Sequence, residues 1–298
     1  MALYLALDCG GSSIRAVVKD EHGAVHFQCE SGSGNLASTP EDVIRANLTA
    51  ALTSCPEVEA CAACFAGLLT SSDRFRAISY LEAIVKADKI DAYPDYYAAL
   101  YADPTADLII IAGTGSLVAS KTPQGVVKSG GGGPLLGDEG STFDIGRRAL
   151  VSQILRATRE SASDLFWEEV ANQFGSVEAN PVIASVYHSP MPAARLAKLV
   201  PAVAVDFNRG FTYAVQAVSD SLGDLVETVA NHLFEYHDGS TVEIRLAGGL
   251  WDIDDLFYEH FSMLLNKKME QEHQRCEPVI RKLESKPIEG AVFLAKQL

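Results

Sequence analysis

The sequence predicts an α/β fold built from two similar domains. Two apolar segments, at residues 3–8 and 107–112, each run directly into a glycine-rich loop that carries hydroxyl side chains. Helical and strand-like patterns alternate between and after them, and no Pro/Ser-rich linker divides the chain. A chain of 298 residues is long enough for two separate hydrophobic cores. We therefore expect two α/β domains that meet directly, with a cleft between them.

The first half predicts three strands followed by alternating helices and strands. The connections between the first three strands are too short for helices, so these strands should be antiparallel neighbours. Thr39 and Pro40 then form a helix start, with a capping threonine and proline at the first position. The expected elements are strands at 3–8, 14–19 and 24–29, a helix at 40–54, a strand at 58–65, a helix near 74–86, a short helix at 94–102 and a strand at 107–112. This order is that of a ribonuclease-H-like domain, which we place at residues 1–105.

The second half repeats this pattern more loosely. A hairpin is expected around Pro123-Gln-Gly125, followed by the glycine run 130–133. The later elements are a helix from about residue 139, an almost entirely helical stretch at 163–236, a strand at 242–251 and a closing helix that ends at Leu298. We expect a second ribonuclease-H-like domain over residues 106–288 with a helical insertion, and a C-terminal helix, 289–298, that packs back on the first domain.

Composition limits the classes of partner. Apolar residues make up 48% of the chain and charged residues 21%, as in ordinary globular proteins. The net charge of −15 and the lack of any long Lys/Arg run argue against nucleic acid and anionic membranes as partners. No apolar stretch reaches 18 residues, and the N-terminal segment lacks a basic region. We therefore expect no membrane association and a cytoplasmic location.

The six cysteines are interpreted as packing residues. Cys61 and Cys64 form a Cys-x-x-Cys pair, but they lie in a strand-like segment and no second pair follows at a metal-binding spacing. Free thiols in such segments behave as small hydrophobic side chains. Zinc, iron–sulfur and redox chemistry are therefore disfavoured.

The two glycine loops predict phosphate binding. Gly10 and Gly11 in the first loop, and Gly113 and Gly115 in the second, allow close approach of backbone N–H groups to an anion. Hydroxyl donors accompany them, at Ser12, Ser13, Thr114 and Ser116. Asp8 ends the first strand, where a carboxylate can hold a hydrated Mg²⁺. Two such loops suggest two half-sites for one nucleotide, which points to a phosphotransferase.

Neither loop matches the better-known nucleotide motifs. A Walker loop needs a Lys-Ser/Thr pair after its last glycine, and neither loop has one. The dinucleotide-binding fingerprint needs a third glycine that the 113–115 loop lacks. A Rossmann dehydrogenase is therefore disfavoured.

Four segments of the chain resemble segments of a known family. They are the two glycine loops, a late Ala-Gly-Gly turn at 247–249 and a glycine-rich stretch between them. The most specific stretch is GGGGPLLGDEGS, residues 130–141, followed by Ile145-Gly146 and Ala149-Leu150. Nearly end to end, the chain resembles the N-acetylglucosamine kinase and BadF/BadG/BcrA/BcrD ATPase group of the actin/hexokinase ATPase superfamily. The resemblance implies two actin-like ATPase domains, ATP and Mg²⁺ as cofactors, an amino sugar as substrate and a homodimer.

The resemblance also implies roles for individual residues. Asp95 matches the general base that accepts the proton of the attacking sugar hydroxyl, and Asp8 the metal-binding carboxylate. The nucleotide would be held by both glycine loops and by Gly248 and Gly249. The sugar would be bound by Asn35, Gly132, Gly133, Asp138 and Thr142. A competing interpretation of Asn35 is a residue that stabilises a turn.

Several positions depart from the family pattern. Ser13 stands where the family often carries a basic residue, and Pro94 replaces an asparagine before the catalytic aspartate. The segment from Phe65 to Thr70 has fewer glycines than usual. The last two departures border the expected sugar pocket and bear on which sugar binds.

Three functions remain open from the sequence. The first is ATP-dependent phosphorylation of an amino sugar, N-acetylglucosamine at its 6-hydroxyl, with glucosamine and N-acetylmuramic acid as alternative substrates. The second is an ATPase activator of an acyl-CoA dehydratase, which would hold an iron–sulfur cluster between subunits. The third is a non-catalytic sugar sensor that keeps the fold.

Overall fold

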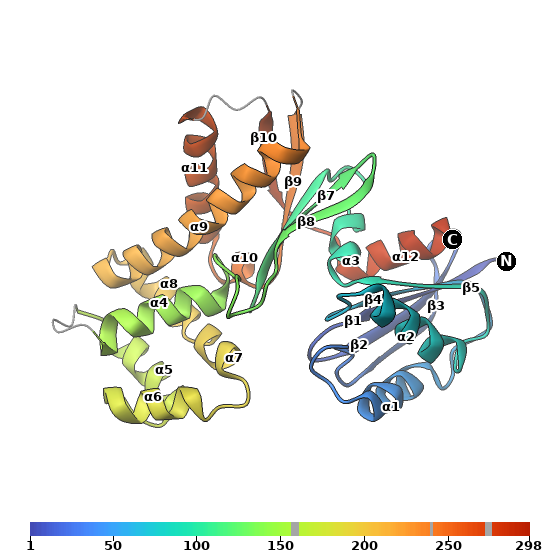
Figure 1. The fold of residues 1–298 in the computed structure, drawn as a ribbon, viewed down its shortest axis with the longest axis horizontal. Helices are drawn as coiled ribbons and strands as arrows, with labels where there is room; N and C mark the ends of the chain where they lie inside the picture. Colours follow the sequence, from blue (N-terminus) through green and yellow to red (C-terminus); the bar gives the residue numbers. More distant parts are fainter. Residues whose placement is uncertain (156–160, 239–240, 272–275) are drawn as a thin grey trace. The chain divides into compact units, whose positions relative to one another are not determined.

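The chain folds into two compact units, each built on a five-stranded sheet (Figure 1). The computed structural model describes residues 1–155, 161–238, 241–271 and 276–298. One unit comprises residues 1–106 and 283–298, and the other comprises residues 107–282. The two units are described separately below.

The first sheet has the strand order β3-β2-β1-β4-β5. Its strands are β1 (Leu3–Cys9), β2 (Ile14–Asp20), β3 (Val25–Ser31), β4 (Val58–Phe65) and β5 (Ala87–Pro94). The first three strands are antiparallel, as their short connections require, and β4 and β5 run parallel to β1. The carboxyl ends of β1, β4 and β5 therefore meet at one edge of the sheet.

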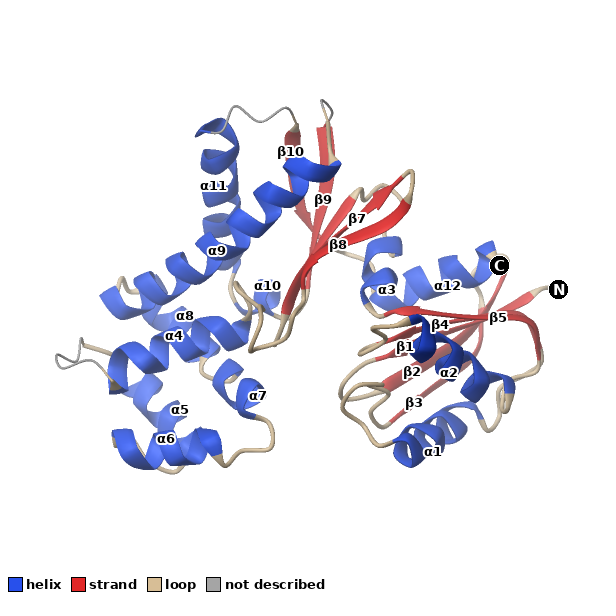
Figure 2. Cartoon of the chain, viewed as in Figure 1, coloured by secondary structure: helices blue, strands red, loops and turns tan. Residues whose placement is uncertain are grey.

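Helices cover both faces of this sheet (Figure 2). On one face, α1 (Glu41–Leu52) and α2 (Ser71–Glu82) contribute to a core with Leu5, Leu7 and Phe65. On the other face, α12 (Pro287–Gln297) packs on β1, β4 and α3 (Tyr96–Tyr101). Gly290 permits this packing, because a Cβ at that position would collide with the backbone oxygen of Ala98.

The second sheet repeats the topology of the first. Its order is β10-β9-β6-β7-β8, formed by β6 (Leu108–Ala112), β7 (Ser116–Thr122), β8 (Gly125–Gly130), β9 (Thr241–Ala247) and β10 (Glu277–Lys282). The strands β6, β7 and β8 are antiparallel, and β9 and β10 run parallel to β6. Strands β6 and β9 thus correspond to β1 and β4.

Helices make up most of the rest of the second unit. Its long helix α9 (Thr212–Tyr236) buries one apolar side in the core of this unit. The others are α4 (Thr142–Ile154), α5 (Asp164–Phe174), α6 (Ala179–Tyr187), α7 (Pro192–Ala197), α8 (Val200–Asn208), α10 (Leu250–Ile253) and α11 (Asp255–Gln271). No helix within the described ranges is both long enough and apolar enough to cross a bilayer.

The predicted α/β class with two ribonuclease-H-like sheets is confirmed, but the strand assignments need two corrections. The segment 107–112, expected to end the first half, begins the second sheet as β6, and β5 is the fifth strand of the first sheet. The sequence analysis missed β5 and β10. Both are edge strands in which most side chains are only half-buried, so their apolar pattern is weak.

A buried histidine joins α9 to the second sheet. His232 is 1% exposed, and its ring nitrogens are hydrogen-bonded to the hydroxyls of Ser120 and Ser129, both at 2.7 Å. Burial, together with nearby His237, lowers the pKa of His232 to about 4. The imidazole is therefore neutral in the folded protein at neutral pH.

This histidine predicts a specific loss of stability in acid. The unfolded histidine has a pKa of about 6.5, so the unfolded state binds an extra proton below that pH. The contribution of His232 is thus complete above pH 6.5 and falls toward pH 4, by about 3 kcal/mol. Between pH 7.5 and 4.5, the free energy of unfolding measured with urea should fall more steeply in the wild type than in His232→Gln. Equal pH slopes in the two proteins would contradict this assignment.

Candidate active site

The first glycine loop forms the turn between β1 and β2. The N–H of Gly10 donates to the carbonyl of Ser13 at 2.9 Å, and the Gly10 carbonyl accepts from Gly34 N at 3.0 Å. Neither Gly10 nor Gly11 has a positive φ, so the turn does not need glycine for its backbone angles. Gly11 and Ser12 are exposed, and a Cβ at Gly11 would meet only open space. The loop therefore presents an accessible backbone to a ligand.

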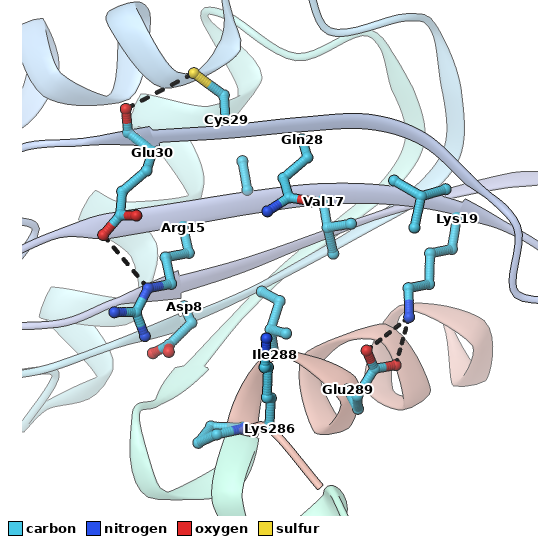
Figure 3. Close-up of a pocket in the computed structure, with 13 residues that line it drawn as sticks. Asp8, Arg15, Val17, Lys19, Gln28, Cys29, Glu30, Lys286, Ile288 and Glu289 are labelled. Carbon is cyan, nitrogen blue, oxygen red and sulfur yellow. Dashed lines mark hydrogen bonds and ion pairs between the residues drawn. The ribbon is translucent and has the colours of Figure 1, made fainter.

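Asp8, just before this loop, lines a polar pocket of about 510 Å³ (Figure 3). Arg15 lies opposite Asp8 in the β1–β2 register and lines the same pocket, as does Lys286 at the start of α12. Burial raises the pKa of Asp8, and the Arg15 charge partly offsets this effect. A half-buried carboxylate beside cationic side chains suits a site for a phosphate and a hydrated cation. Asp8 alone among the pocket's carboxylates was singled out from the sequence.

Asp8 and Asp95 lie at the same edge of the first sheet. Asp8 pairs in register with Cys64 and Cys64 with Tyr93, so Asp95 follows the end of β5 two strands away, about 10 Å in backbone spacing. Burial raises the pKa of the Cys64 thiol, and the charges of Asp8 and Asp95 raise it further. The thiol thus lies near both carboxylates, which flank the ends of the parallel strands.

Asp95 begins α3. Its backbone N–H donates to the Phe65 carbonyl at 3.1 Å, which ties the end of β5 to the end of β4. Its carboxylate accepts from the N–H of Tyr96 at 2.9 Å, and the residue is exposed. The side chain is therefore both fixed by the helix start and accessible to a substrate hydroxyl.

Asn35 stabilises a turn near the same end of the sheet. Its Oδ1 accepts from the N–H groups of Ala37 at 2.8 Å and Ser38 at 3.1 Å. Gly67 packs so closely that a Cβ there would lie 2.5 Å from Asn35 Oδ1. The oxygen is committed to the turn, which leaves the amide N–H groups of Asn35 as the part available to a ligand.

The second glycine loop, between β6 and β7, is held from several sides. The Gly113 carbonyl accepts from both the N–H and the hydroxyl of Thr142, each at 2.8 Å. The Ser116 hydroxyl donates to the Glu139 carbonyl at 2.6 Å, so it is already occupied. Thr114, at the tip, is exposed. Of the three hydroxyl residues assigned to phosphate or sugar here, Thr114 is exposed, whereas the hydroxyls of Ser116 and Thr142 are bonded to backbone carbonyls.

Asp138 lies against this loop. It is 7% exposed, and its Oδ1 accepts from Ser116 N at 3.2 Å. Gly115 allows this close packing, because a Cβ there would lie 3.0 Å from both carboxylate oxygens. Burial raises the pKa of Asp138, although the Ser116 N–H opposes this shift. Asp138, assigned to the sugar, thus supports the second loop directly.

The glycine run before Asp138 belongs to an exposed loop. Gly133 has a φ of 78°, and Gly132 packs against the backbone of Leu136. Leu135 and Leu136 are 93% and 87% exposed. These two glycines, assigned to the sugar, therefore lie on a protruding loop whose apolar side chains face solvent.

A buried carboxylate anchors the segment that follows. Asp144 is 3% exposed and accepts from the Ser221 hydroxyl of α9 at 2.7 Å and from Arg148 Nε at 2.8 Å. The Ser221 oxygen in turn accepts from Gly140 N at 3.2 Å. This chain of contacts connects α9 to the residues that support the second loop.

A second pocket, of about 850 Å³, lies beside the second loop. Gly113, Thr114, Thr142 and Gly249 line one part of it. Its remaining wall is mostly apolar and comes from helices α5, α7, α8 and α10, with Leu165, Glu169, Ala194, Ala197, Lys198, Pro201, Ala202, Val205 and Ile253. A polar, glycine-rich end and an apolar wall match the phosphate and base of a nucleotide.

Gly248 and Gly249 form the turn after β9. Gly248 has a φ of 100°, and a Cβ would collide with the Ala112 carbonyl at the end of β6. The structure thus places this turn against the second loop, and Gly249 in the same pocket as Thr114. Thr142, assigned to the sugar, also lines this pocket. The sequence reasoning missed Glu169 and Lys198, which have no motif around them.

These two sheet edges, each with a glycine loop after its first strand, define an actin-like ATPase fold. The family model described as "BadF/BadG/BcrA/BcrD ATPase family" matches residues 5–295, and the chain belongs to this family. A relative from Clostridium acetobutylicum, an N-acetylmuramic acid/N-acetylglucosamine kinase, is 23% identical over 89% of this chain and 91% of its own length.

Solved structures share the fold. A candidate N-acetylglucosamine kinase of Chromobacterium violaceum superposes with a TM-score of 0.71 and 21% identity, covering 99% of both chains. A ROK family glucokinase from Streptomyces griseus, solved with glucose and AMPPNP, gives a TM-score of 0.61 and 15% identity over 100% of both chains. At these identities the likeness shows a common architecture.

Proposed function

We propose that this protein is an ATP-dependent amino-sugar kinase that converts N-acetylglucosamine to its 6-phosphate. The observation that carries the proposal is that Asp8 and Asp95 lie at the same carboxyl edge of the first sheet. The chain also belongs to a family that is described as ATPases. The names of the Clostridium relative and the Chromobacterium protein support an amino sugar as substrate.

In the proposed reaction, Asp95 accepts the proton of the sugar 6-hydroxyl. The hydroxyl oxygen forms a bond to the γ-phosphorus of ATP as the bond from that phosphorus to the β–γ bridging oxygen breaks, and ADP leaves. A Mg²⁺ ion held by Asp8 through its waters would neutralise charge on the phosphates. Arg15 adds a second positive charge at the Asp8 pocket, two residues after the serine that departs from the family pattern.

We assign the nucleotide to the second pocket and the two glycine loops. Gly10, Gly11, Ser12 and Ser13 would contact phosphate in the first unit, and Thr114 and Gly115 in the second, with Gly249 beside the adenosine. Ser116 and Gly248 act indirectly, since the Ser116 hydroxyl is bonded to the Glu139 carbonyl and Gly248 packs against the backbone of Ala112.

The sugar assignments rest on fewer contacts. Asn35 offers amide N–H groups and Gly132 and Gly133 offer backbone, whereas Asp138 and Thr142 would act by holding the second loop. N-acetylmuramic acid carries a carboxylate that needs a cation. Arg74 already donates to both carboxylate oxygens of Asp91, at 2.6 and 2.7 Å, and Arg76 to Asp73 at 2.9 Å. This pairing favours N-acetylglucosamine or glucosamine.

The burial of the Cys61–Cys64 pair argues against the activator of an acyl-CoA dehydratase. An iron–sulfur cluster between subunits needs thiolates that reach the surface. Cys61 and Cys64 are fully buried within β4, and burial raises the pKa of both thiols. Iron and sulfide analysis of the purified protein tests this alternative directly.

A coupled ADP-release assay tests the proposed function. We expect the highest kcat/KM with N-acetylglucosamine, followed by glucosamine, and at least tenfold less with N-acetylmuramic acid, because Arg74 and Arg76 are already paired with Asp91 and Asp73. Omission of Mg²⁺ should abolish release. ADP release that does not depend on any amino sugar would contradict the proposal. A homodimeric assembly and a cytoplasmic location are part of the same proposal.

A further inference from the structure

The second pocket contains one half-buried carboxylate that the proposed reaction does not use. Glu169, on α5, lines the pocket together with Leu165 one turn earlier, so one face of α5 forms part of its wall. The neighbouring Glu168 is exposed and does not line the pocket. An acceptor-only group in a mostly apolar wall calls for a donor on whatever binds there.

Glu169 is held in place by its own helix. Gln173 Nε2, one turn later, donates to Glu169 Oε1 at 2.8 Å, and the Gln173 carbonyl accepts from Arg195. This contact fixes one carboxylate oxygen and leaves Oε2 for a second donor. Lys198, the other charged residue of the wall, is exposed and can remain in solvent.

Glu169 and the phosphate end of the pocket come from different elements. That end is marked by Gly113, Thr114 and Gly249, whereas α5 packs on α6 and α8. Pro201, Ala202 and Val205, on α8, give an apolar surface on which a flat base can lie. A nucleotide with its phosphates at the loop would thus direct the edge of its base toward α5.

We propose that Glu169 accepts a hydrogen bond from the exocyclic 6-amino group of adenine and thereby selects adenine nucleotides. This inference rests on the proposed function, because it requires that the nucleotide occupies this pocket. Guanine and hypoxanthine carry an oxygen at the same position, and two acceptors facing each other repel. Glu169 is therefore a specificity-determining residue for the base and takes no part in phosphoryl transfer.

A binding cycle without sugar isolates this contact. ATP and purine riboside triphosphate, which lacks only the 6-amino group, are titrated calorimetrically into wild-type protein, Glu169→Ala and the control Glu168→Ala. A hydrogen bond to a charged group should give the wild type and the control about a tenfold preference for ATP. Glu169→Ala should bind both nucleotides equally, within about twofold.

A second variant covers the case in which Glu169→Ala does not fold. Glu169→Gln keeps a carbonyl acceptor but adds an N–H donor, so the ratio of GTP affinity to ATP affinity should rise relative to the wild type. A tenfold preference for ATP that survives in Glu169→Ala would overturn the proposal. So would wild-type protein that binds GTP more tightly than ATP, since a carboxylate also pairs with the N1–H and 2-amino edge of guanine.

The outcome separates this inference from the proposed function. If Glu169→Ala loses the preference for ATP but no amino sugar is phosphorylated by the wild type, the kinase assignment fails and the base assignment stands. If the sugar is phosphorylated but Glu169→Ala keeps the preference for ATP, only the role of Glu169 fails.

Discussion

Asp95→Asn is expected to lower phosphoryl transfer to N-acetylglucosamine by about three orders of magnitude, the middle of the range for loss of a general base. Asparagine keeps an oxygen that can accept from Tyr96 N, so the start of α3 should be preserved. It cannot accept the hydroxyl proton at neutral pH. The measurement is kcat from ADP release, together with the Kd for the sugar, which should change less than threefold.

The control for this substitution lies on β5, the strand that precedes Asp95. Asp88→Asn changes an exposed aspartate at the opposite end of β5, far along the strand from the carboxyl edge. It should leave both kcat and sugar affinity unchanged. An Asp95→Asn protein with near-normal turnover would show that another group accepts the proton. Lost turnover together with lost sugar binding would instead assign Asp95 to substrate binding.

The fold was predictable because its inner strands carry strong signals. The apolar segments that became β1, β4 and β6 are mostly buried, and each is followed by a turn or loop residue pattern that marks its end. The edge strands β5 and β10 carry charged residues on a half-covered surface, so nothing in their sequences separates them from loops. Their existence depends on pairing with β4 and β9, which a local pattern does not contain.

The site was predictable only where residues carry their own motif. The glycine loops follow strands that the sequence predicts, so their positions at the sheet edges could be inferred. Asp95 was assigned through the family resemblance alone, because the strand that precedes it, β5, was not predicted. The contacts of Asp138 could not, because they depend on Gly115 and Ser116, which lie more than twenty residues earlier in the sequence and adjacent in space. Glu169 and Arg15 belong to no motif. They reach their pockets through the packing of α5 on α8 and the β1–β2 register.

The two sheets share one topology, but their carboxyl edges carry different chemical groups. In both sheets the first strand ends in a glycine loop that leads into an antiparallel neighbour. The first sheet adds carboxylates at that edge, through Asp8 and Asp95. The second has backbone and hydroxyl groups there, and its Asp138 is buried against the loop. The first edge therefore suits acid–base and cation chemistry, and the second suits phosphate.

Asp144→Ala is expected to lower the free energy of unfolding by about 3 kcal/mol and to weaken ATP binding. Asp144 is buried, which raises its pKa, but hydrogen bonds from Ser221, Arg147 and Arg148 outweigh burial, and the net pKa is lowered. Without the carboxylate, Arg148 and Ser221 lose a buried partner. Gly140, which donates to Ser221, then loses its fixed acceptor, and the support of the second loop loosens.

Urea unfolding at pH 7 and calorimetric ATP binding measure the two effects. Asp224→Asn is the matched control, because Asp224 is 50% exposed and pairs with the same Arg148 at 2.5 Å. A surface ion pair contributes about 0.5 kcal/mol, so the control should stay close to the wild type in both measurements. Asp144→Asn, which retains the shape of the side chain, serves if the alanine variant does not fold. If Asp144→Ala were no less stable than Asp224→Asn, the buried carboxylate would make no net contribution to the free energy of unfolding. If it were less stable but bound ATP normally, its network would support α4 and α9 without reaching the second loop.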